Sequence, residues 1–253
     1  MASYMIRIEN LSKHYGHLAA VDGIDLGVTS GEIFGFLGPN GAGKTTTMRV
    51  MMGILRATSG RVLLGGYDVE REPEKAKAIT GFVPDLPFLY EKLSGREFLN
   101  FVGGLHQIPP EPRQGRILEL LELFELSDAK DDLIESYSHG MKQRLALSAS
   151  LIHRPRILLI DEPMVGMDPR GAKMLKDLFV SLAGGGTTVF LSTHSISVAE
   201  EICHRVGIIH RGKLIAVGTM PELYRMAKIK EERLESAFLE LTRAPTEPTP
   251  ERS

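Results

Sequence analysis

The chain has 253 residues, of which 43% are hydrophobic, a size that suits one α/β domain with a smaller appendage or two small domains. Its formal net charge of −2 argues against a protein that works on nucleic acid, because such proteins carry a basic face, although a local basic patch stays compatible with it. The single cysteine, Cys203, excludes an internal disulfide and fits a reducing compartment.

The apolar runs are too short for membrane spans. The run 157–160 is far shorter than the roughly 20 residues that a bilayer-spanning helix needs. The first ten residues contain Arg7 and Glu9 and no long apolar core, so they do not resemble a secretory signal. We therefore expect a soluble protein that, if it works at a membrane, docks on another chain that spans it.

The first third of the chain alternates short apolar runs with turns. Strands are predicted at 5–8 and 24–28, on either side of a polar loop that contains Tyr15, and they open an antiparallel β subdomain. An apolar strand, a helix and two further strands follow, at 33–37, 45–55, 61–64 and up to 83, where Pro84 ends the last strand.

From about residue 86 to 152 the strand signals disappear, and an α-helical subdomain is predicted as an insertion. Its helices are expected at 97–106, 113–125 and 140–152. Buried strands then return at 156–160 and 187–191, without the polar alternation of a half-exposed strand, as expected for a parallel sheet. Helices at 169–182 and 196–203 and a hairpin over 206–217 complete an α/β fold with a mostly parallel sheet.

The C-terminal end is predicted to contain one more helix. Leu234, Phe238 and Leu241 recur at helical spacing, which predicts an amphipathic helix over 231–243. The remaining residues, 244–253, are polar and rich in proline, and we expect them to be disordered. The main domain is therefore predicted to span residues 1–230.

A phosphate-binding loop follows the strand at 33–37. The pattern G-x-x-x-x-G-K-[ST] is matched at every fixed position, and the strand before it and the helix after it supply the required setting. Lys44 is expected to reach the β- and γ-phosphates, and the Thr45 hydroxyl to bind Mg²⁺. The predicted nucleotide-binding residues of this loop are Gly38, Pro39, Asn40, Gly41, Ala42, Gly43, Lys44, Thr45 and Thr46. This motif predicts a phosphate-loop NTPase core.

Two carboxylates end the apolar strand at 156–160. In phosphate-loop enzymes the first acid at such a strand end holds Mg²⁺, which assigns Asp161 to the metal. Glu162 points elsewhere in extended backbone and is assigned as the general base that activates water. Many buried strands end in an acid, so this pattern gains its weight from the phosphate loop upstream.

The segment Tyr137 to Arg144 opens a helix just before that strand. Ser138 is a good N-cap type, and the helix N-terminus with the bare Gly140 amide would attract an anion. The alternative interpretation is a plain helix cap, and the octapeptide alone does not decide between them.

Together these motifs are similar to the nucleotide-binding subunit of ABC transporters, over about residues 5 to 225. Ser138 and Gly140 match the family signature, L-S-G-G-Q, whereas Tyr137, His139 and Met141 depart from it. The form Y-S-x-G-M-K-Q-R resembles the exporter branch in which the membrane half is a separate, ABC-2 type polypeptide.

Further positions carry the resemblance. Asp168 lies in a segment that resembles the family's D-loop, at the dimer interface, and His194 resembles its switch histidine. Tyr15 occupies the place of the aromatic residue that stacks on adenine, although a loop tyrosine is frequently only packing. Asp85 stands where the family places a glutamine. We interpret it as a working variant that takes a water on Mg²⁺, and the alternative is a solvent-facing acid without a catalytic part.

The resemblance implies an ATP-hydrolysing motor that dimerises around ATP and Mg²⁺. One chain's phosphate loop, with Asp161 and Glu162, would hold ATP, and the signature residues Ser138, His139, Gly140 and Met141 of a second chain would close over its γ-phosphate. The implied partners are an identical or closely related second nucleotide-binding subunit and a multi-span membrane permease, with no nucleic acid expected. The implied location is peripheral, on the cytoplasmic face of the cell membrane.

The apolar cluster near the root of the insertion is the expected permease-docking surface, although some of its members are expected to be core. It consists of Phe88, Leu89, Tyr90 and Leu93. The alternative function is a soluble ABC-type ATPase in a non-transport process. Repair-type relatives insert long coiled coils for which the gap between the two nucleotide motifs has no room, and ribosomal relatives carry two phosphate loops. A generic phosphate-loop kinase or GTPase would lack Ser138, Gly140 and His194 in this order.

Overall fold

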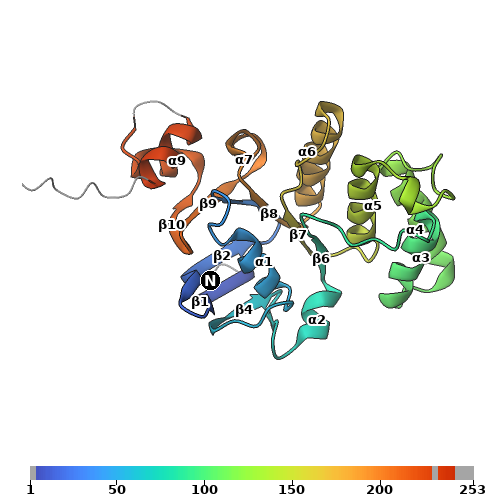
Figure 1. Ribbon diagram of the computed structural model, residues 1–253, viewed down its shortest axis with the longest axis horizontal. Helices are drawn as coiled ribbons and strands as arrows, with labels where there is room; N and C mark the ends of the chain where they lie inside the picture. Colours follow the sequence, from blue (N-terminus) through green and yellow to red (C-terminus); the bar gives the residue numbers. More distant parts are fainter. Residues whose placement is uncertain (1–3, 230–232, 243–253) are drawn as a thin grey trace, which may run out of the picture.

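The computed structural model describes residues 4–229 and 233–242, which form two β-sheets and the helices around them (Figure 1). The larger sheet has six strands in the order β10-β9-β3-β8-β7-β6. Five of them pair in parallel, and β10 joins β9 as an antiparallel edge strand. They are β3 (Ile33–Leu37), β6 (Thr80–Val83), β7 (Ile157–Asp161), β8 (Thr188–Thr193), β9 (Arg205–His210) and β10 (Lys213–Gly218).

The central strands β3, β7 and β8 are buried along their whole length, which explains their continuous apolar sequences. Because successive side chains point to opposite faces, each strand feeds two separate cores. Leu158 and Leu191 pack with the helical subdomain on one face, and Leu159 and Phe190 pack with the N-terminal sheet on the other. The predicted mostly parallel α/β core is confirmed.

The smaller sheet is antiparallel, in the order β2-β1-β4-β5, and it confirms the predicted N-terminal β subdomain. Its strands are β1 (Tyr4–Tyr15), β2 (Leu18–Thr29), β4 (Ser59–Leu64) and β5 (Tyr67–Asp68). The prediction of a polar loop around Tyr15 was wrong. Tyr15 pairs with Leu18 across a tight turn, and β1 and β2 form one long hairpin with several register shifts. The polar residues there extend an exposed hairpin end, so polarity alone did not indicate a loop.

Three helices lie between β6 and β7 and form a separate group beyond the β6 edge (Figure 1). They are α3 (Gly95–Leu105), α4 (Pro110–Leu123) and α5 (His139–Leu151), with a 3₁₀ turn at Ile134–Ser136. The remaining helices before the C-terminal region are α1 (Lys44–Met51), α2 (Pro73–Ala78), α6 (Pro169–Gly184) and α7 (Ile196–Ile202). The predicted helical insertion is therefore present, with boundaries that differ by a few residues.

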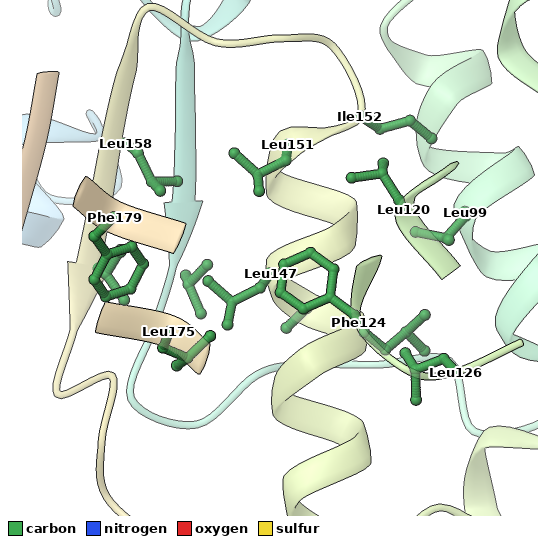
Figure 2. Close-up of a cluster of buried hydrophobic side chains, with 14 of the residues drawn as sticks. Leu99, Leu120, Phe124, Leu126, Leu147, Leu151, Ile152, Leu158, Leu175 and Phe179 are labelled. Atoms are coloured by element: carbon green, nitrogen blue, oxygen red, sulfur yellow. The ribbon is translucent and has the colours of Figure 1, made fainter. Parts of the chain in front are cut away.

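Helix α5 is packed between the rest of its subdomain and the sheet (Figure 2). Leu147 of α5 lies between Phe124, at the end of α4, and the side chains of α6, and Leu151 lies one turn further along α5. Each fully buried side chain of this size contributes about 1.5–3 kcal/mol by burial. The C-terminal half of α5 is therefore held by a core that continues into α6.

The C-terminal region contains a helix that the sequence analysis missed, α8 (Met220–Met226). Thr219 and Glu222 form its capping box, a T-x-x-E signal that is visible in the sequence. Helix α9 (Leu234–Thr242) corresponds to the predicted helix over 231–243 but starts later, since Arg233 is not helical. Residues 231, 232 and 243 and the predicted disordered tail 244–253 lie outside the described residues. Within the described ranges, no helix is long and apolar enough to cross a bilayer.

Candidate functional site

The phosphate loop runs from the end of β3 into α1, with Pro39, Asn40 and Gly41 exposed. Gly43 caps α1 in a left-handed conformation, with φ of 112°, and a Cβ there would lie 2.4 Å from the carbonyl oxygen of Ala20. Only glycine fits such a position. The loop is therefore held close to the backbone of Ala20 at this glycine.

Lys44 is almost fully buried and lies back across the loop. Its Nζ atom donates hydrogen bonds to the carbonyl oxygens of Gly38, at 2.8 Å, and Pro39, at 3.4 Å. The same ammonium group lies 3.2 Å from Oε1 of Glu162. The one cation of the loop is thus positioned between the loop backbone and the carboxylate at the end of β7.

Asp161 is the last residue of β7 and is 1% exposed. The hydroxyl groups of Ser192 and Thr45 both hydrogen-bond to its carboxylate. Burial raises the pKa of Asp161, and the negative charges of Asp85 and Glu162 add to that shift, whereas the two hydroxyl groups oppose it. Asp161 is therefore a buried acid surrounded by oxygen atoms and by other acids.

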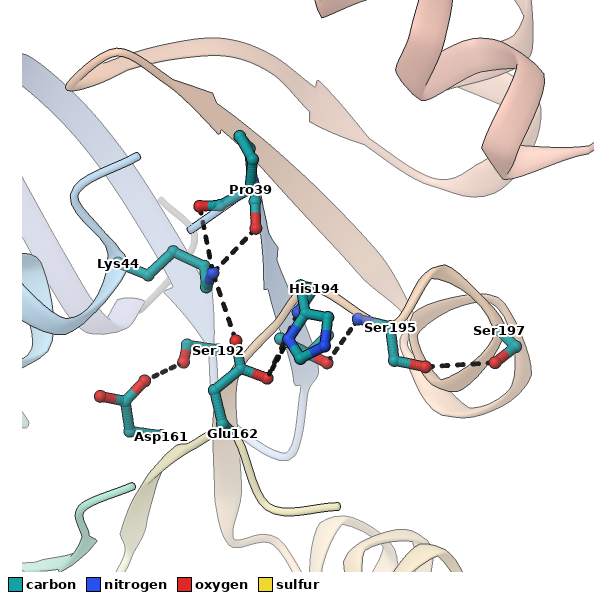
Figure 3. A network of polar contacts seen from close by, with 10 residues as sticks. Pro39, Lys44, Asp161, Glu162, Ser192, His194, Ser195 and Ser197 are labelled. Atoms are coloured by element: carbon teal, nitrogen blue, oxygen red, sulfur yellow. Dashed lines mark hydrogen bonds and ion pairs between the residues drawn. The ribbon is translucent and has the colours of Figure 1, made fainter. Parts of the chain in front are cut away.

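Glu162 is the meeting point of the polar network drawn in Figure 3. Its Oε2 atom lies 2.9 Å from Nδ1 of His194, which follows β8, and accepts the His194 backbone N–H at 3.4 Å. Lys44 contacts the other carboxylate oxygen (Figure 3). Glu162 also has a φ of 50°, an uncommon conformation for a residue with a side chain. Strain of this kind is concentrated at functional sites.

Asp85 and Tyr15, the other two residues predicted for the nucleotide site, lie at its edge. Asp85 is exposed just after β6, and its charge is close enough to raise the pKa of Asp161. Tyr15 is about half exposed at the end of β1, with the Lys13 ammonium 5.2 Å from the centre of its ring. The backbone of Ala20, on the paired strand β2, contacts the phosphate loop at Gly43.

The predicted signature residues begin α5. Ser138 is the N-cap, and its Oγ accepts a hydrogen bond from the N–H of Met141 at 3.3 Å. A Cβ on Gly140 would meet no atom of the described chain within 4 Å. The His139 ring packs beside Gly166, where an added Cβ would lie 2.9 Å from the ring. Packing within the described chain therefore does not require a glycine at position 140.

Asp168 has the same role at α6, where its Oδ1 atom accepts the N–H of Gly171 at 2.7 Å. The helix starts of α5 and α6 border one shared cavity of about 340 Å³. Ser138, Gly140 and Asp168 all line it. The structure thus joins the predicted signature and D-loop residues into one surface.

The predicted residues fall into two groups. Lys44, Thr45, Asp161, Glu162 and His194 meet at the carboxyl ends of the parallel strands, where ligands bind in such sheets. Within the described residues, no hydrogen bond or ion pair joins the signature start to the phosphate loop. The sequence analysis missed Ser192, although its pairing with Asp161 in adjacent strands makes its place predictable once the strand order is known.

The first group fits a magnesium ion of the kind that a nucleotide brings. Mg²⁺ is usually held by one or two carboxylates or hydroxyls, by phosphates and by water, rather than by a full protein cage. The described residues contain no cluster of three or more His, Cys, Asp or Glu side chains suited to a metal. They do provide the buried Asp161 carboxylate hydrogen-bonded to the Thr45 hydroxyl, with neighbouring acids whose repulsion a cation would relieve.

The sequence matches the family model for the ABC transporter over residues 21–165. The chain is 42% identical over 223 residues to the daunorubicin resistance ATP-binding protein DrrA3 of Streptomyces coeruleorubidus, covering 88% of this chain and 71% of that one. It is 39% identical over 219 residues to the linearmycin resistance ATP-binding protein LnrL of Bacillus subtilis (strain 168), covering 87% and 70%.

A solved structure of an ATP-binding subunit of an ABC transporter superposes with a TM-score of 0.89. It is 28% identical and covers 94% of this chain and 100% of that one. The sequence match, the shared fold and the arrangement of the phosphate loop and strand-end acids all agree. The chain therefore belongs to the ABC transporter family, of which it is an ATP-binding ATPase subunit.

Proposed function

We propose that this subunit hydrolyses ATP at the interface of a head-to-tail dimer and drives export through a separate membrane permease. One observation carries the proposal. The open, anion-attracting start of α5 and the phosphate loop belong to separate surfaces of the same chain, and a Cβ added to Gly140 would meet no described atom within 4 Å. A second chain can supply what each surface lacks.

Each residue of the phosphate-loop group has a proposed role. Lys44 exchanges its contacts with loop carbonyls and Glu162 for the β- and γ-phosphates. Thr45 and Asp161 hold Mg²⁺, and Asp85 reaches it through water. Bound Mg²⁺ would neutralise part of the negative charge on the phosphates. Tyr15 stacks on the adenine.

Glu162 is the proposed general base, because it lies beside the loop and is oriented by two groups. When ATP withdraws Lys44 from Oε1, that oxygen becomes free to accept a proton from water. His194 holds Oε2 at 2.9 Å and so fixes the direction of the other oxygen. His194 also contacts the γ-phosphate and senses its loss.

The signature surface is proposed to act on the partner's nucleotide. The N-terminus of α5, with Ser138, His139, Gly140 and Met141, supplies N–H groups and a favourable helix dipole for the γ-phosphate. The segment around Asp168, which lines the same cavity, forms part of the same dimer contact. Loss of the γ-phosphate removes the shared anion and lets the two chains separate.

The permease is proposed to dock in a cavity of about 420 Å³ at the root of the helical subdomain. Phe88 is 95% exposed at its edge, and Leu89, Phe98 and Val102 line it. The Asp85 loop lies directly before this cluster, so a docked helix would be next to a residue of the nucleotide site. In this arrangement the subunit is peripheral on the cytoplasmic face of the membrane.

Export is the direction favoured by the relatives, whose names refer to resistance against daunorubicin and linearmycin. The alternative is a soluble ABC-type ATPase with a non-transport role. Purification of the tagged chain from detergent-solubilised membranes tests the choice. We expect a multi-span protein to co-purify and a Phe88→Asp variant to lose it while keeping its melting temperature. Recovery of ribosomes or DNA without a membrane protein would contradict the transport role.

A further inference from the structure

We propose that Glu125 is a positioning residue that joins the signature helix to the D-loop helix, so that both act on the partner's ATP as one unit. The inference rests on the dimer proposed above. It assigns a role to a residue that lies outside all of the nucleotide motifs. Glu125 directly follows the end of α4 and lines the same cavity as Ser138, Gly140 and Asp168.

The Glu125 carboxylate is shared between two arginines. Its Oε2 atom lies 3.2 Å from Nη1 of Arg144, on α5, and its Oε1 atom lies 2.6 Å from Nη2 of Arg170, at the start of α6. Arg144 also donates to the carbonyl oxygen of Phe124 at 3.2 Å. One side chain therefore connects the C-terminal end of α4, the second turn of α5 and the start of α6.

Both arginines lie close to the residues that are proposed to contact the partner. Arg144 is on α5, which begins at the signature, and Arg170 is two residues after Asp168. The hydrophobic core alone already holds the inner parts of α5 and α6 together (Figure 2). The Glu125 bridge lies beside the cavity of about 340 Å³, which is lined by residues of both helices.

The backbone at Glu125 has a conformation that is unfavourable for a residue with a side chain. The N–H of Leu126 donates to Leu121 O at 2.7 Å, and the N–H of Glu125 donates to Glu122 O at 3.0 Å. These two bonds form a Schellman motif, in which the residue at the Glu125 position usually is glycine. Glu125 has a φ of 54°, a left-handed conformation that glycine adopts freely and glutamate does not.

The neighbours of Glu125 fix that conformation. Phe124 and Leu126 are both buried, so the turn between them cannot relax without exposing one of them. A glycine at position 125 would suit the turn better and would leave the Arg144 contact with Phe124 O in place. Only the two ion pairs require a carboxylate here.

The test compares Glu125→Gly, Glu125→Gln and the control Glu122→Gln. Glu122 is an exposed acid on the last turn of α4 that, among the described residues, makes no side-chain hydrogen bond or ion pair. We expect both Glu125 variants to lower kcat by about three- to tenfold, because two exposed ion pairs are lost. The affinity of the monomer for ATP, measured by equilibrium dialysis, should change by less than about twofold, since the phosphate loop is untouched. The control should keep the wild-type kcat.

Stability separates positioning from a merely structural role. We expect the melting temperature of Glu125→Gly to be equal to or above that of the wild type, because glycine relieves the left-handed backbone. A fall in kcat that is accompanied by a lower melting temperature in Glu125→Gly would overturn the proposal. An unchanged kcat in both Glu125 variants would also overturn it.

The dimer is measured in parallel by sedimentation with Mg-ATP in a Glu162→Gln background. Adding Glu125→Gly should raise the ATP concentration needed for half-maximal dimerisation by about three- to tenfold. An unchanged midpoint would overturn the role of Glu125 alone. Absence of an ATP-dependent dimer in the Glu162→Gln parent would instead overturn the proposed function on which this inference rests.

Discussion

The phosphate-loop group and the signature surface differ in where their polar atoms find partners. Lys44, Asp161 and Glu162 are bound to one another and to neighbouring strands within the same chain. Within the part of the chain that the structure describes, Ser138 makes hydrogen bonds only in its own helix start, and Ser138 and Gly140 line a cavity. In the phosphate-loop group the polar atoms are already paired, so ATP must replace some of these contacts. The signature surface has an open front that a ligand can fill.

The polar groups of the phosphate-loop motif are therefore paired within the chain, whereas the front of the signature motif is left open. The strand ends position the acids with backbone pairing, so that Asp161 lies opposite Ser192 in the sheet. The start of α5 is positioned by the core behind it and by Glu125, while its front stays open. Glycine substitutions in the phosphate loop should therefore lower the melting temperature and ATP binding, whereas those at the start of α5 should lower kcat alone.

The largest effect is expected for Glu162→Gln. The amide keeps the size of the side chain but cannot accept the proton of the attacking water, so kcat should fall by about 10²- to 10³-fold. ATP binding should be retained, which equilibrium dialysis with labelled nucleotide would measure. A fall in kcat of less than about tenfold would remove Glu162 from the role of general base.

The two glycines give the sharpest contrast between the regions. Gly43→Ala should lower the melting temperature and ATP binding, because its Cβ would collide with Ala20 O at a φ of 112°. Gly140→Ala should leave the melting temperature unchanged and lower kcat by tenfold or more, since its Cβ is free within the chain and would block only the partner's phosphate. Thermal denaturation and steady-state ATPase assays on both variants check this, and the reverse pattern would contradict the comparison.

Ser192→Ala should have a smaller effect on the phosphate-loop side. It removes one of the two hydroxyl groups that bond to the Asp161 carboxylate and leaves Thr45 in place. We expect the magnesium concentration for half-maximal ATPase activity to rise by about three- to tenfold, because such outer partners orient metal ligands. Ser195→Ala is a matched control, since among the described residues its hydroxyl hydrogen-bonds only to Ser197. Equal magnesium dependence in the two variants would exclude this role for Ser192.

The smallest effect concerns the end of α5 that lies opposite the signature. His153 stacks on His106 with ring centres 3.8 Å apart, and burial together with His106 lowers the pKa of His153 to about 4 from 6.5. Below pH 6.5 the unfolded chain therefore binds a proton that the folded chain resists, so stability should be full above about pH 6.5 and fall toward about pH 4.

His153→Phe keeps a stacked ring and cannot titrate. Its melting temperature should consequently depend less on pH between 6.5 and 4 than that of the wild type. Differential scanning calorimetry at matched ionic strength measures the difference. Parallel curves for the two proteins would show that this histidine does not contribute to the acid sensitivity.

The sequence predicted the parallel core and the phosphate-loop group because local patterns carry them. An apolar run that ends in Asp161-Glu162 predicts both a buried strand and the position of functional residues at its end. The helix start at Ser138 was also predicted from its cap residue, whereas Asp168 was identified only by its resemblance to the D-loop. The long hairpin around Tyr15 was missed because exposed strands resemble loops in polarity, and α8 because it is short.

Contacts between distant segments could not be predicted. The Glu162–His194 contact depends on the order of β7 and β8 in the sheet. Glu125 meets Arg144 only after the helices of the insertion have packed together, and it meets Arg170 only after the insertion has packed on α6. A single sequence shows the residues of such networks without showing that they touch. The division at residue 230 and the disordered tail 244–253 stay predictions.

The most direct test of the central claim is complementation between two inactive variants. Lys44→Ala removes the phosphate-loop lysine, and Gly140→Asp places a negative charge on the signature, where the open surroundings and the helix start tolerate it. If the site is shared head to tail, a mixed dimer has one intact site, and an equal mixture should regain about a quarter of the wild-type turnover. A mixture that is no more active than its separate components would contradict a shared site.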